Sequence, residues 1–460
     1  MDQQQPGPIG FEGGPPQPAM PPQPGAPPGG GVPPPSYQAV AGTPLMKVDF
    51  PPQVLNPNGG MFSQPEYERF EVLMARANQW LMGNPGLIVI HVEGIETTRG
   101  HHNEPYADTE SSVYIEYGDR YTIYTRSLRL WVRTRSGNDP PTPQQLGYFN
   151  VIPACLSSGG FLSYPEFESF DITINKINQY FRQQPIPGKI ITLETEDIKM
   201  SAWKGTVDAD KTHWSTWGDR GIFFINVIRI FYELGPPAME EIGCADFVPS
   251  MTDSGGIFSF GHAQSLSVVA GQAHEWIKQQ QGISISNIQT IDYKMSRSWG
   301  GGTLNTMRSS YYHRGSGTTV FMRIMRVCYT RSLSGAPPTP PPFMTYRTFT
   351  PHCLGSGGLF SMPQFTNQSS AVDIANAWLK ATGAKVISAE TVPVRTRSGG
   401  QYGDPEVTMT YDSGNMNEII MFVVRVFLDG VYQDPPPEAL PLPPAVMSAS
   451  SANTECCTIL

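Results

Sequence analysis

The feature that most constrains this 460-residue chain is a fourfold internal repeat with a period close to 100 residues. A Gly-Gly pair followed by two apolar residues and a serine begins at Gly59, Gly159, Gly255 and Gly357, at intervals of 100, 96 and 102 residues. An aromatic residue keeps the same period at Trp80, Tyr180, Trp276 and Trp378. A strand-like apolar-Arg-apolar element closes each unit at Arg129, Arg229, Arg326 and Arg425. Three landmarks with one period indicate a supersecondary unit repeated in tandem.

Each repeat carries the signals of one helix. A serine hydroxyl can accept a bond from an N–H group that the first helical turn leaves without a partner. The predicted N-caps are Ser63, Ser163, Ser259 and Ser361. Pro65-Glu66 and Pro165-Glu166 follow two of them, which places proline in the first turn and glutamate at the capping-box position. In the first repeat, residues at helical spacing form one apolar face: Phe70, Leu73, Met74, Ala77, Trp80 and Leu81.

Strand signals follow each helix. In the first two repeats they cover 87–92 and 189–193, with weaker signals at 112–117 and 203–207. The predicted closing strands cover 122–132, 222–232, 320–329 and 419–427. One helix packed on a small, mainly antiparallel sheet is an α+β unit, so we predict four tandem α+β repeats. The predicted modules, separated by proline-rich joins, are 46–139, 140–237, 238–336 and 337–432. A module of about 85 to 100 residues is large enough to bury its own core.

The two ends of the chain differ in composition from the body. Residues 1–45 hold 14 of the 45 prolines, residues 433–460 hold six more, and neither segment contains Lys or Arg. Such segments cannot bury enough apolar surface to offset the entropy of ordering. The sequence therefore predicts disordered Pro/Gly-rich tails at 1–45 and 433–460 around a large folded body.

Charge, hydropathy and cysteine usage exclude several classes of protein. The body carries 31 basic and 35 acidic residues without a basic stripe, which argues against a nucleic-acid-binding protein. No apolar run approaches the roughly 18 residues of a transmembrane helix. The first residues lack both the basic and the apolar region of a secretory leader. The six cysteines show no metal-type pairing and are typical of reduced thiols, so a cytoplasmic protein is expected.

An acidic residue precedes the arginine of each repeat by a nearly constant interval. The predicted pairs are Glu93 with Arg129, Glu194 with Arg229, Asp292 with Arg326, and Glu390 with Arg425. Opposite charges at a fixed separation on neighbouring strands suggest cross-strand pairs. Two interpretations stay open: partly buried ion pairs that fix strand register, or four sites that bind a polar ligand. The first is favoured, because an architectural pair should recur in every repeat.

Signals for catalysis are weak. His101-His102 lies in a polar stretch without a nearby Cys or a helical HExxH motif, and Gly300-Gly301-Gly302 lacks the lysine of a phosphate-binding loop. Asn78, Asn178 and Asn376 share one position beside the helix aromatic, where the third repeat has His274. An amide there is expected to bond backbone groups rather than perform chemistry. We predict no enzyme activity, no cofactor and no metal site.

The last four residues resemble the CaaX box of prenylated proteins. They read Cys457-Thr458-Ile459-Leu460, and a terminal leucine implies geranylgeranylation of Cys457. One lipid chain usually needs a second signal for stable anchoring. The tail offers no basic residues, so the adjacent Cys456 is the predicted site of a second, palmitoyl chain.

The N-terminal tail contains a PPxY sequence, which resembles the ligands of WW domains. Its members are Pro34, Pro35 and Tyr37. Proline favours an extended conformation that lowers the entropy cost of docking in an aromatic groove. A WW-domain protein is therefore an expected partner.

These signals favour a prenylated, multi-module scaffold held at the cytoplasmic face of a membrane, with its N-terminal tail recruiting a WW-domain protein. The alternative is a protein that binds a small polar or glycan-like ligand, through the acid–arginine pairs or through clefts between modules. The sequence leaves the arrangement of the modules open between a string, paired pseudo-dimers and a closed ring.

Overall fold

The computed structural model describes most of the body and short parts of the tails. The described residues are 11–13, 42–56, 65–98, 108–116, 121–137, 139–159, 164–200, 206–217, 221–253, 261–295, 304–313, 319–334, 340–355, 363–396, 403–412 and 417–442.

Every repeat has the same order of elements. The first contains Leu45–Phe50 (β2), Val54–Asn56 (β3), Glu66–Tyr67 (β4), Phe70–Gly83 (α1), Leu87–Thr98 (β5), Val113–Glu116 (β6) and Tyr121–Thr134 (β7). The second contains Leu146–Val151 (β8), Cys155–Ser157 (β9), Glu166–Phe167 (β10), Phe170–Gln183 (α2), Gly188–Lys199 (β11), His213–Trp217 (β12) and Ile222–Leu234 (β13). The third contains Glu240–Phe247 (β14), Met251–Asp253 (β15), His262–Ala263 (β16), Leu266–Gln279 (α3), Ser284–Lys294 (β17), Ser310–His313 (β18) and Thr319–Ser332 (β19). The fourth contains Met344–Phe349 (β20), Cys353–Gly355 (β21), Gln364–Phe365 (β22), Gln368–Thr382 (α4), Val386–Thr396 (β23), Met409–Asp412 (β24) and Glu418–Asp429 (β25).

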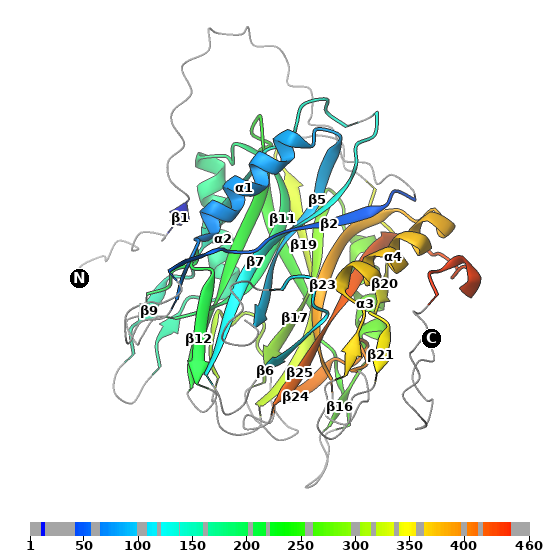
Figure 1. Cartoon of the computed structure of the whole chain (residues 1–460). Helices are drawn as coiled ribbons and strands as arrows, with labels where there is room; N and C mark the ends of the chain where they lie inside the picture. Colours follow the sequence, from blue (N-terminus) through cyan, green and yellow to red (C-terminus); the bar gives the residue numbers. More distant parts are fainter. Residues whose placement is uncertain are drawn as a thin grey trace, which may run out of the picture.

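The repeats form four blade-like antiparallel sheets around an axis, a propeller-like arrangement (Figure 1). Each blade is numbered by the repeat that supplies its longest strand. In blade 1, β7 pairs with β5 along one edge, while β2 and β12 lie end to end along the other edge. The inner strands β5, β11, β17 and β23 lie next to one another around the axis. The expectation of four repeated α+β units holds at this level.

Exchange of one short strand per repeat closes the ring. The second repeat gives β12 to blade 1, the third gives β18 to blade 2, and the fourth gives β24 to blade 3. The first repeat gives β6 to blade 4, where it pairs with β25. The closed ring is therefore the correct choice among the three arrangements that the sequence left open.

Each hydrophobic core is shared between neighbouring repeats. The buried face of α1 lies in one cluster with strands β5 and β7 of its own repeat and with Leu146, Tyr148 and Phe231 of the second repeat. The cluster around α4 includes Leu45 and Trp131 of the first repeat. The expectation that each module buries its own core is therefore wrong, because each helix is wedged between two blades and its apolar face is covered from both sides.

The helix starts differ from those predicted. The helices begin at Phe70, Phe170, Leu266 and Gln368, several residues after the predicted serine caps Ser63, Ser163, Ser259 and Ser361. Those serines lie outside the described residues and do not precede the helices directly. Glu66 and Glu166 lie in the short strands β4 and β10 instead of a first helical turn. Each Gly-Gly motif thus falls between the two strands of a small hairpin, and the second of these strands separates it from the helix.

The helix N-termini are satisfied largely by neighbouring repeats. The first N–H of each helix donates to a backbone carbonyl of the next repeat around the ring, at Asp210, Met307, Glu406 and Glu110 respectively, over 2.8–3.0 Å. Among the four helices that the structure describes, only α4 is capped by the side chain of its own N-cap residue, in which Asn367 accepts from the Ser370 N–H at 3.0 Å. In α3 the Ser267 N–H donates instead to the Glu406 carboxylate of the fourth repeat, at 3.1 Å. Tertiary contacts replace the local caps that the sequence suggested.

The strand predictions hold for the long elements and for one short one. The closing strands β7, β13, β19 and β25 and the short strand β6 lie where they were predicted. The strand predicted at 203–207 falls mostly on residues outside the described part, and the described short strand of this repeat is β12, at His213–Trp217.

Parts of both predicted tails have regular structure. Phe11–Gly13 (β1) pairs with β8, and Leu45 already belongs to β2. At the other end, Pro437–Ala439 (η1) is a short 3-10 helix. The predicted disorder therefore does not extend through the whole of 1–45 and 433–460.

Candidate functional site

One fully buried arginine occurs in each blade of the ring. Arg129, Arg229, Arg326 and Arg425 are each 0% exposed. Each lies in the longest strand of its blade, and its Nε donates to a polar side chain of that blade's first strand. The acceptors are Asp49 at 2.6 Å, Asn150 at 2.8 Å, Asp246 at 2.6 Å and Thr348 at 3.2 Å. A buried guanidinium is tolerated only when such partners compensate for the loss of water.

Three of the predicted acidic residues lie directly opposite their arginines. Strand register aligns Glu93 with Arg129, Glu194 with Arg229, and Glu390 with Arg425. Among these described pairs, only Glu390 and Arg425 are in ion-pair contact, at 3.1 Å. The acids are 4–6% exposed, so neither member of these pairs faces an open site.

The predicted pairing of Asp292 with Arg326 is wrong. Asp292 lies opposite Arg323 and accepts from its Nε at 2.8 Å, while Gln289 lies opposite Arg326. The chain between β17 and β19 is longer than the corresponding segment of the other repeats. Counting back from Arg326 by about the interval of the other repeats therefore leads to Asp292, three residues past Gln289 on β17.

The residues at these acidic positions bind backbone across the seams between neighbouring blades. Glu93 accepts from the Thr391 N–H at 2.9 Å and from the Thr391 hydroxyl at 2.8 Å. Glu390 binds Thr290 in the same way, at 2.9 Å for both bonds. Gln289 accepts from the Thr195 N–H at 3.0 Å. In these three threonine seams, the threonine hydroxyl also accepts from a buried arginine at 2.7–2.9 Å.

The seam between blades 1 and 2 is built differently. Glu194 accepts from the N–H of Gly94, which stands where the other seams have threonine. The Glu196 carboxylate fills the space that a side chain at Gly94 would need. It lies 2.7 Å from Arg229 and 3.1 Å from Arg126. Comparing the repeats position by position would have shown this exception, because residue 196 corresponds to Ile95, Ile291 and Val392.

Burial raises the pKa of several carboxyl groups near the axis. Desolvation raises the pKa of Glu93 to about 7 against the opposing effect of Arg129. Desolvation likewise raises the pKa of Glu96 to about 7 and that of Asp197 to about 6. Burial raises the pKa of Glu194 as well, and the neighbouring Glu196 carboxylate adds to that rise. The seams therefore contain acids that hold a proton near neutral pH.

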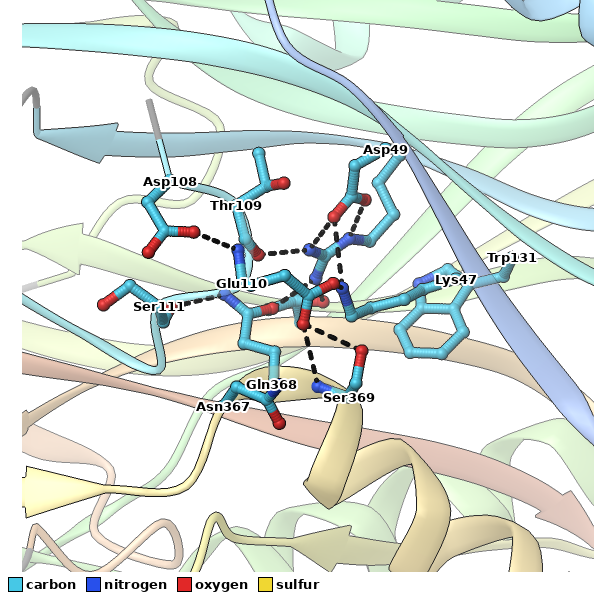
Figure 2. Close-up of polar contacts among 12 residues, drawn as sticks. Lys47, Asp49, Asp108, Thr109, Glu110, Ser111, Trp131, Asn367, Gln368 and Ser369 are labelled. Carbon is cyan, nitrogen blue, oxygen red and sulfur yellow. Dashed lines mark hydrogen bonds and ion pairs between the residues drawn. The ribbon is translucent and has the colours of Figure 1, made fainter. Parts of the chain in front are cut away.

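The seam between blades 4 and 1 joins the two ends of the repeat array (Figure 2). Arg129 makes a two-point contact with Asp49 at 2.6 and 2.7 Å. Its Nη1 also donates to Gln368 at 2.7 Å, at the helix position where the other repeats have Phe or Leu. Glu110 accepts from the Ser369 hydroxyl at 2.8 Å and contacts Lys47. This network ties β2 of the first repeat to α4 of the fourth.

The asparagines beside the helix aromatics clasp the neighbouring blade, as expected for an amide that bonds backbone. Asn78 binds both the N–H and the carbonyl of Leu146, at 2.8 and 2.9 Å. Asn178 binds Ile242, and Asn376 binds Leu45, in the same two-point manner. His274, at the fourth such position, packs against the ring of Phe343 with centroids 4.1 Å apart.

The two segments that border the repeat array, around Gly42 and Leu440, meet at α4. The Gly42 N–H donates to the carbonyl of Ala384, just after α4, at 3.0 Å. The Trp378 indole N–H donates to Asp434 at 2.8 Å. Leu440 packs against the same cluster as α4. Gly42 and Leu440, which border the two predicted tails, therefore lie at the same helix, while Phe11–Gly13 pairs with β8 of blade 2.

The remaining predicted sites lie outside the described residues. They are His101, His102, Gly300, Gly301, Gly302, Pro34, Pro35, Tyr37, Cys456 and Cys457. In the part that the structure describes, no group of three His, Cys, Asp or Glu side chains is placed to hold a metal ion. The described cysteines are free thiols, and none of the described helices has the length and hydrophobicity to cross a membrane.

The described site is thus a set of seams in which buried charges hold blades together. Its arginines and carboxylates bind one another and the backbone, an arrangement that fixes the ring. Comparison with family models, with curated proteins and with solved structures gave no match for the chain.

Proposed function

We propose that this protein is a membrane-tethered scaffold whose ring carries a WW-domain ligand on the segment that precedes Gly42 and a lipid anchor on the segment that follows Leu440. The observation that carries the proposal is that the described residues nearest to the two motifs in the folded body, Gly42 and Leu440, both lie at α4. Gly42 is bonded next to that helix and Leu440 packs on its cluster.

The lengths of the tails set how far each motif reaches from α4. Tyr37 precedes Gly42 by five residues, and Cys457 follows Leu442 by 15 residues. A chain spans at most about 3.5 Å per residue, so Cys457 reaches no more than roughly 50 Å from Leu442. The composition predicts disorder there, and a random coil of 15 residues has a typical end-to-end distance of about 20 Å. A partner bound at Tyr37 would therefore be held close to the membrane that receives the lipid.

The body supports a scaffold role more than catalysis or ligand binding. The four repeated guanidinium groups are fully buried and bonded within the protein, so they do not form ligand pockets. The alternative of a ligand site at each acid–arginine pair loses its support for this reason. A ring with four interlocked seams gives a stable platform that two tails can use.

Membrane fractionation tests the anchor. We expect the full chain to enter the membrane fraction and Cys457→Ser to leave it, because the thioether bond to the prenyl group forms on that sulfur. Cys456→Ser should weaken retention, since a single chain with no basic patch binds a membrane only marginally. Cys155→Ser is the matched control, because it removes an exposed thiol of the folded body. Retention of the Cys457→Ser protein would exclude the lipid anchor.

A pull-down with an isolated WW domain tests the ligand segment. Tyr37→Ala should abolish capture, because the tyrosine is the specificity-determining side chain of the motif. Ser36→Ala is the control, since it changes the variable position of PPxY and should leave capture intact. Equal capture of both variants would remove the WW partner from the proposal.

A further inference from the structure

Two free thiols face each other on neighbouring strands of blade 3. Cys244 of β14 lies directly opposite Cys328 of β19, and their Sγ atoms are 3.5 Å apart. The Cys328 residue is 1% exposed, whereas Cys244 is partly exposed. The two residues stand 84 positions apart in the chain, so the fold alone brings them together.

The backbone at this place suits a disulfide. The Ile242 N–H donates to the Asn178 side chain, which also binds the Ile242 carbonyl, so both groups point away from β19. Pairs along an antiparallel ladder alternate, and β14 shows no register shift, so Cys244 and Cys328 also form a non-hydrogen-bonded pair. The Cα atoms of such a pair lie about 4.5 Å apart, within the range of about 4.4–6.8 Å that disulfides need. The sulfurs can therefore reach bonding distance by side-chain rotation while the strands keep their places.

Larger side chains occupy the same two positions in the other three blades. The pairs there are Lys47 with Trp131, Tyr148 with Phe231, and Tyr346 with Phe427. The fold therefore packs this place with bulky groups and does not require cysteine at either position. In blade 3 both positions carry a thiol, which is the combination that formation of a disulfide needs.

The two thiols differ in how readily a reagent reaches them. The contact with Cys244, together with burial, raises the pKa of the Cys328 thiol well above its usual range. A buried thiol of that kind reacts slowly, because the thiolate is the nucleophile. Cys244 is the more accessible of the two. An oxidant therefore meets Cys244 first, with Cys328 in place to react next.

We propose that Cys244 and Cys328 are a redox-active pair that hydrogen peroxide converts into an intrachain disulfide. In the first step the Cys244 thiol takes one oxygen atom from the peroxide, which gives a sulfenic acid and one water molecule. In the second step the Cys328 sulfur attacks the Cys244 sulfur, and the S–O bond breaks. The hydroxyl group leaves with the Cys328 proton as a second water molecule.

The bond would act as a clamp at the join between the second and third repeats. The strand β14 is the outer strand of blade 3, and Asn178 of α2 binds it at Ile242. A disulfide would tie β14 covalently to β19, the longest strand of the blade. It would also close the chain over 84 positions, which lowers the entropy of the unfolded state. This inference concerns the folded body and is independent of the lipid and WW motifs.

Peptide mapping of the oxidised full chain tests the bond without any variant. The reduced protein is treated with hydrogen peroxide, remaining thiols are blocked with N-ethylmaleimide, and a protease digest is analysed by mass spectrometry. We expect a cross-linked peptide pair that contains Cys244 and Cys328 and that dithiothreitol separates. Cys155→Ser is the matched control, because it removes an exposed thiol and should leave the cross-link intact. Oxidation that leaves Cys244 and Cys328 unlinked would overturn the proposal.

Single substitutions test the order of the two steps. Cys328→Ala removes the thiol that attacks the sulfenic acid, so dimedone should label Cys244 at least about tenfold more than in the wild type. Cys244→Ala should leave Cys328 unlabelled, because that thiol is buried. Equal labelling of Cys244 in the wild type and in Cys328→Ala would show that Cys328 does not attack.

Urea denaturation tests the clamp. The oxidised wild type should unfold at a higher urea concentration than the reduced wild type, and dithiothreitol should abolish the difference. Cys244→Ala, treated with peroxide in the same way, should show no rise in its urea midpoint. A cross-linked wild type with an unchanged or lower midpoint would exclude the clamp.

Discussion

The seam between blades 1 and 2 differs from the other three in one coordinated change. In the threonine seams, one residue binds the neighbouring acid or amide through its N–H, and its hydroxyl accepts from a buried arginine. At Gly94 the hydroxyl is missing, and Glu196 reaches into the vacated space to contact Arg229 at 2.7 Å. A neutral acceptor is thus replaced by a carboxylate. The comparison shows that each buried guanidinium needs an acceptor group, either from across a seam or from its own sheet. That acceptor can be a neutral hydroxyl or a carboxylate.

Removing the carboxylate should have the largest effect. Glu196→Ile restores the residue type of the other repeats but leaves Arg229 buried without its anionic partner, because Gly94 has no hydroxyl to replace it. Loss of one member of a buried pair costs about 3–5 kcal/mol. Urea denaturation should show that decrease in the free energy of unfolding. A decrease below about 1 kcal/mol would mean that the remaining partners of Arg229, which include Asn150, suffice.

Filling the space at position 94 should have the next largest effect. The Cβ of Gly94→Thr overlaps the Glu196 carboxylate, and overpacking of this kind costs about 1–3 kcal/mol.

The double variant Gly94→Thr/Glu196→Ile rebuilds a threonine seam and should recover stability, because the new hydroxyl can accept from Arg229. The double-mutant cycle should give a favourable coupling of about 1–3 kcal/mol. Additive effects would show that the two positions do not compensate for each other.

A threonine seam can be weakened without changing its shape. Thr391→Val removes the hydroxyl that bridges Arg129 and Glu93, which leaves a buried donor and a buried acceptor short of a partner. The expected loss in the free energy of unfolding is about 1–3 kcal/mol. Thr97→Val is the control, since the buried hydroxyl of Thr97 makes no hydrogen bond within the described residues. Equal losses for both variants would assign the effect to packing.

The smallest expected effect is a change in the free energy of unfolding with pH, and its size should differ between the seams. Glu93 has a pKa of about 7 in the folded protein and about 4.5 when unfolded, so its contribution to stability is complete below pH 4.5 and is lost as pH rises through 7. Below pH 6.5, His91 acts in the opposite direction, because burial lowers its pKa to about 3. The informative window therefore lies above pH 6.5, where we expect stability to fall toward pH 8.5 by up to about 1 kcal/mol per raised acid.

Two variants should show how much each seam contributes to this fall in stability with rising pH. Glu93→Gln should flatten it, and Glu194→Gln should flatten it more, because the Glu196 carboxylate adds to the rise in the Glu194 pKa. The measurement is the urea midpoint at several pH values from 6.5 to 8.5. A slope that neither variant changes would place the titrating groups elsewhere, and Glu233, whose pKa burial raises to about 7, would be examined next.

Periodic patterns predicted the long elements well. The apolar face of α1 and the closing strands follow from local spacing, since a helix or a long strand repeats its own pattern. The serine caps were wrong because a two-residue strand lies between each serine and its helix, and so short a strand leaves no periodic signal. The pairing of Asp292 was wrong because loop length varies between repeats. Gly94 and Glu196 were missed because the prediction rested on features that all four repeats share, and these two residues differ from their counterparts in the other repeats.

The sequence by itself determined the fourfold repeat, the α+β character of each unit, and the positions of the four arginines. Those features depend on residues close together in the chain or on a comparison between repeats. Only the tertiary structure decided that the units close into a ring, that each lends a strand to its neighbour, and that Gly42 and Leu440 lie at the same helix. These depend on contacts such as Asn376 with Leu45 and Glu93 with Thr391, which join residues about 300 positions apart. No local sequence pattern specifies such partners, because many other surfaces of the chain have a similar polarity and could pair in their place until the blades assemble.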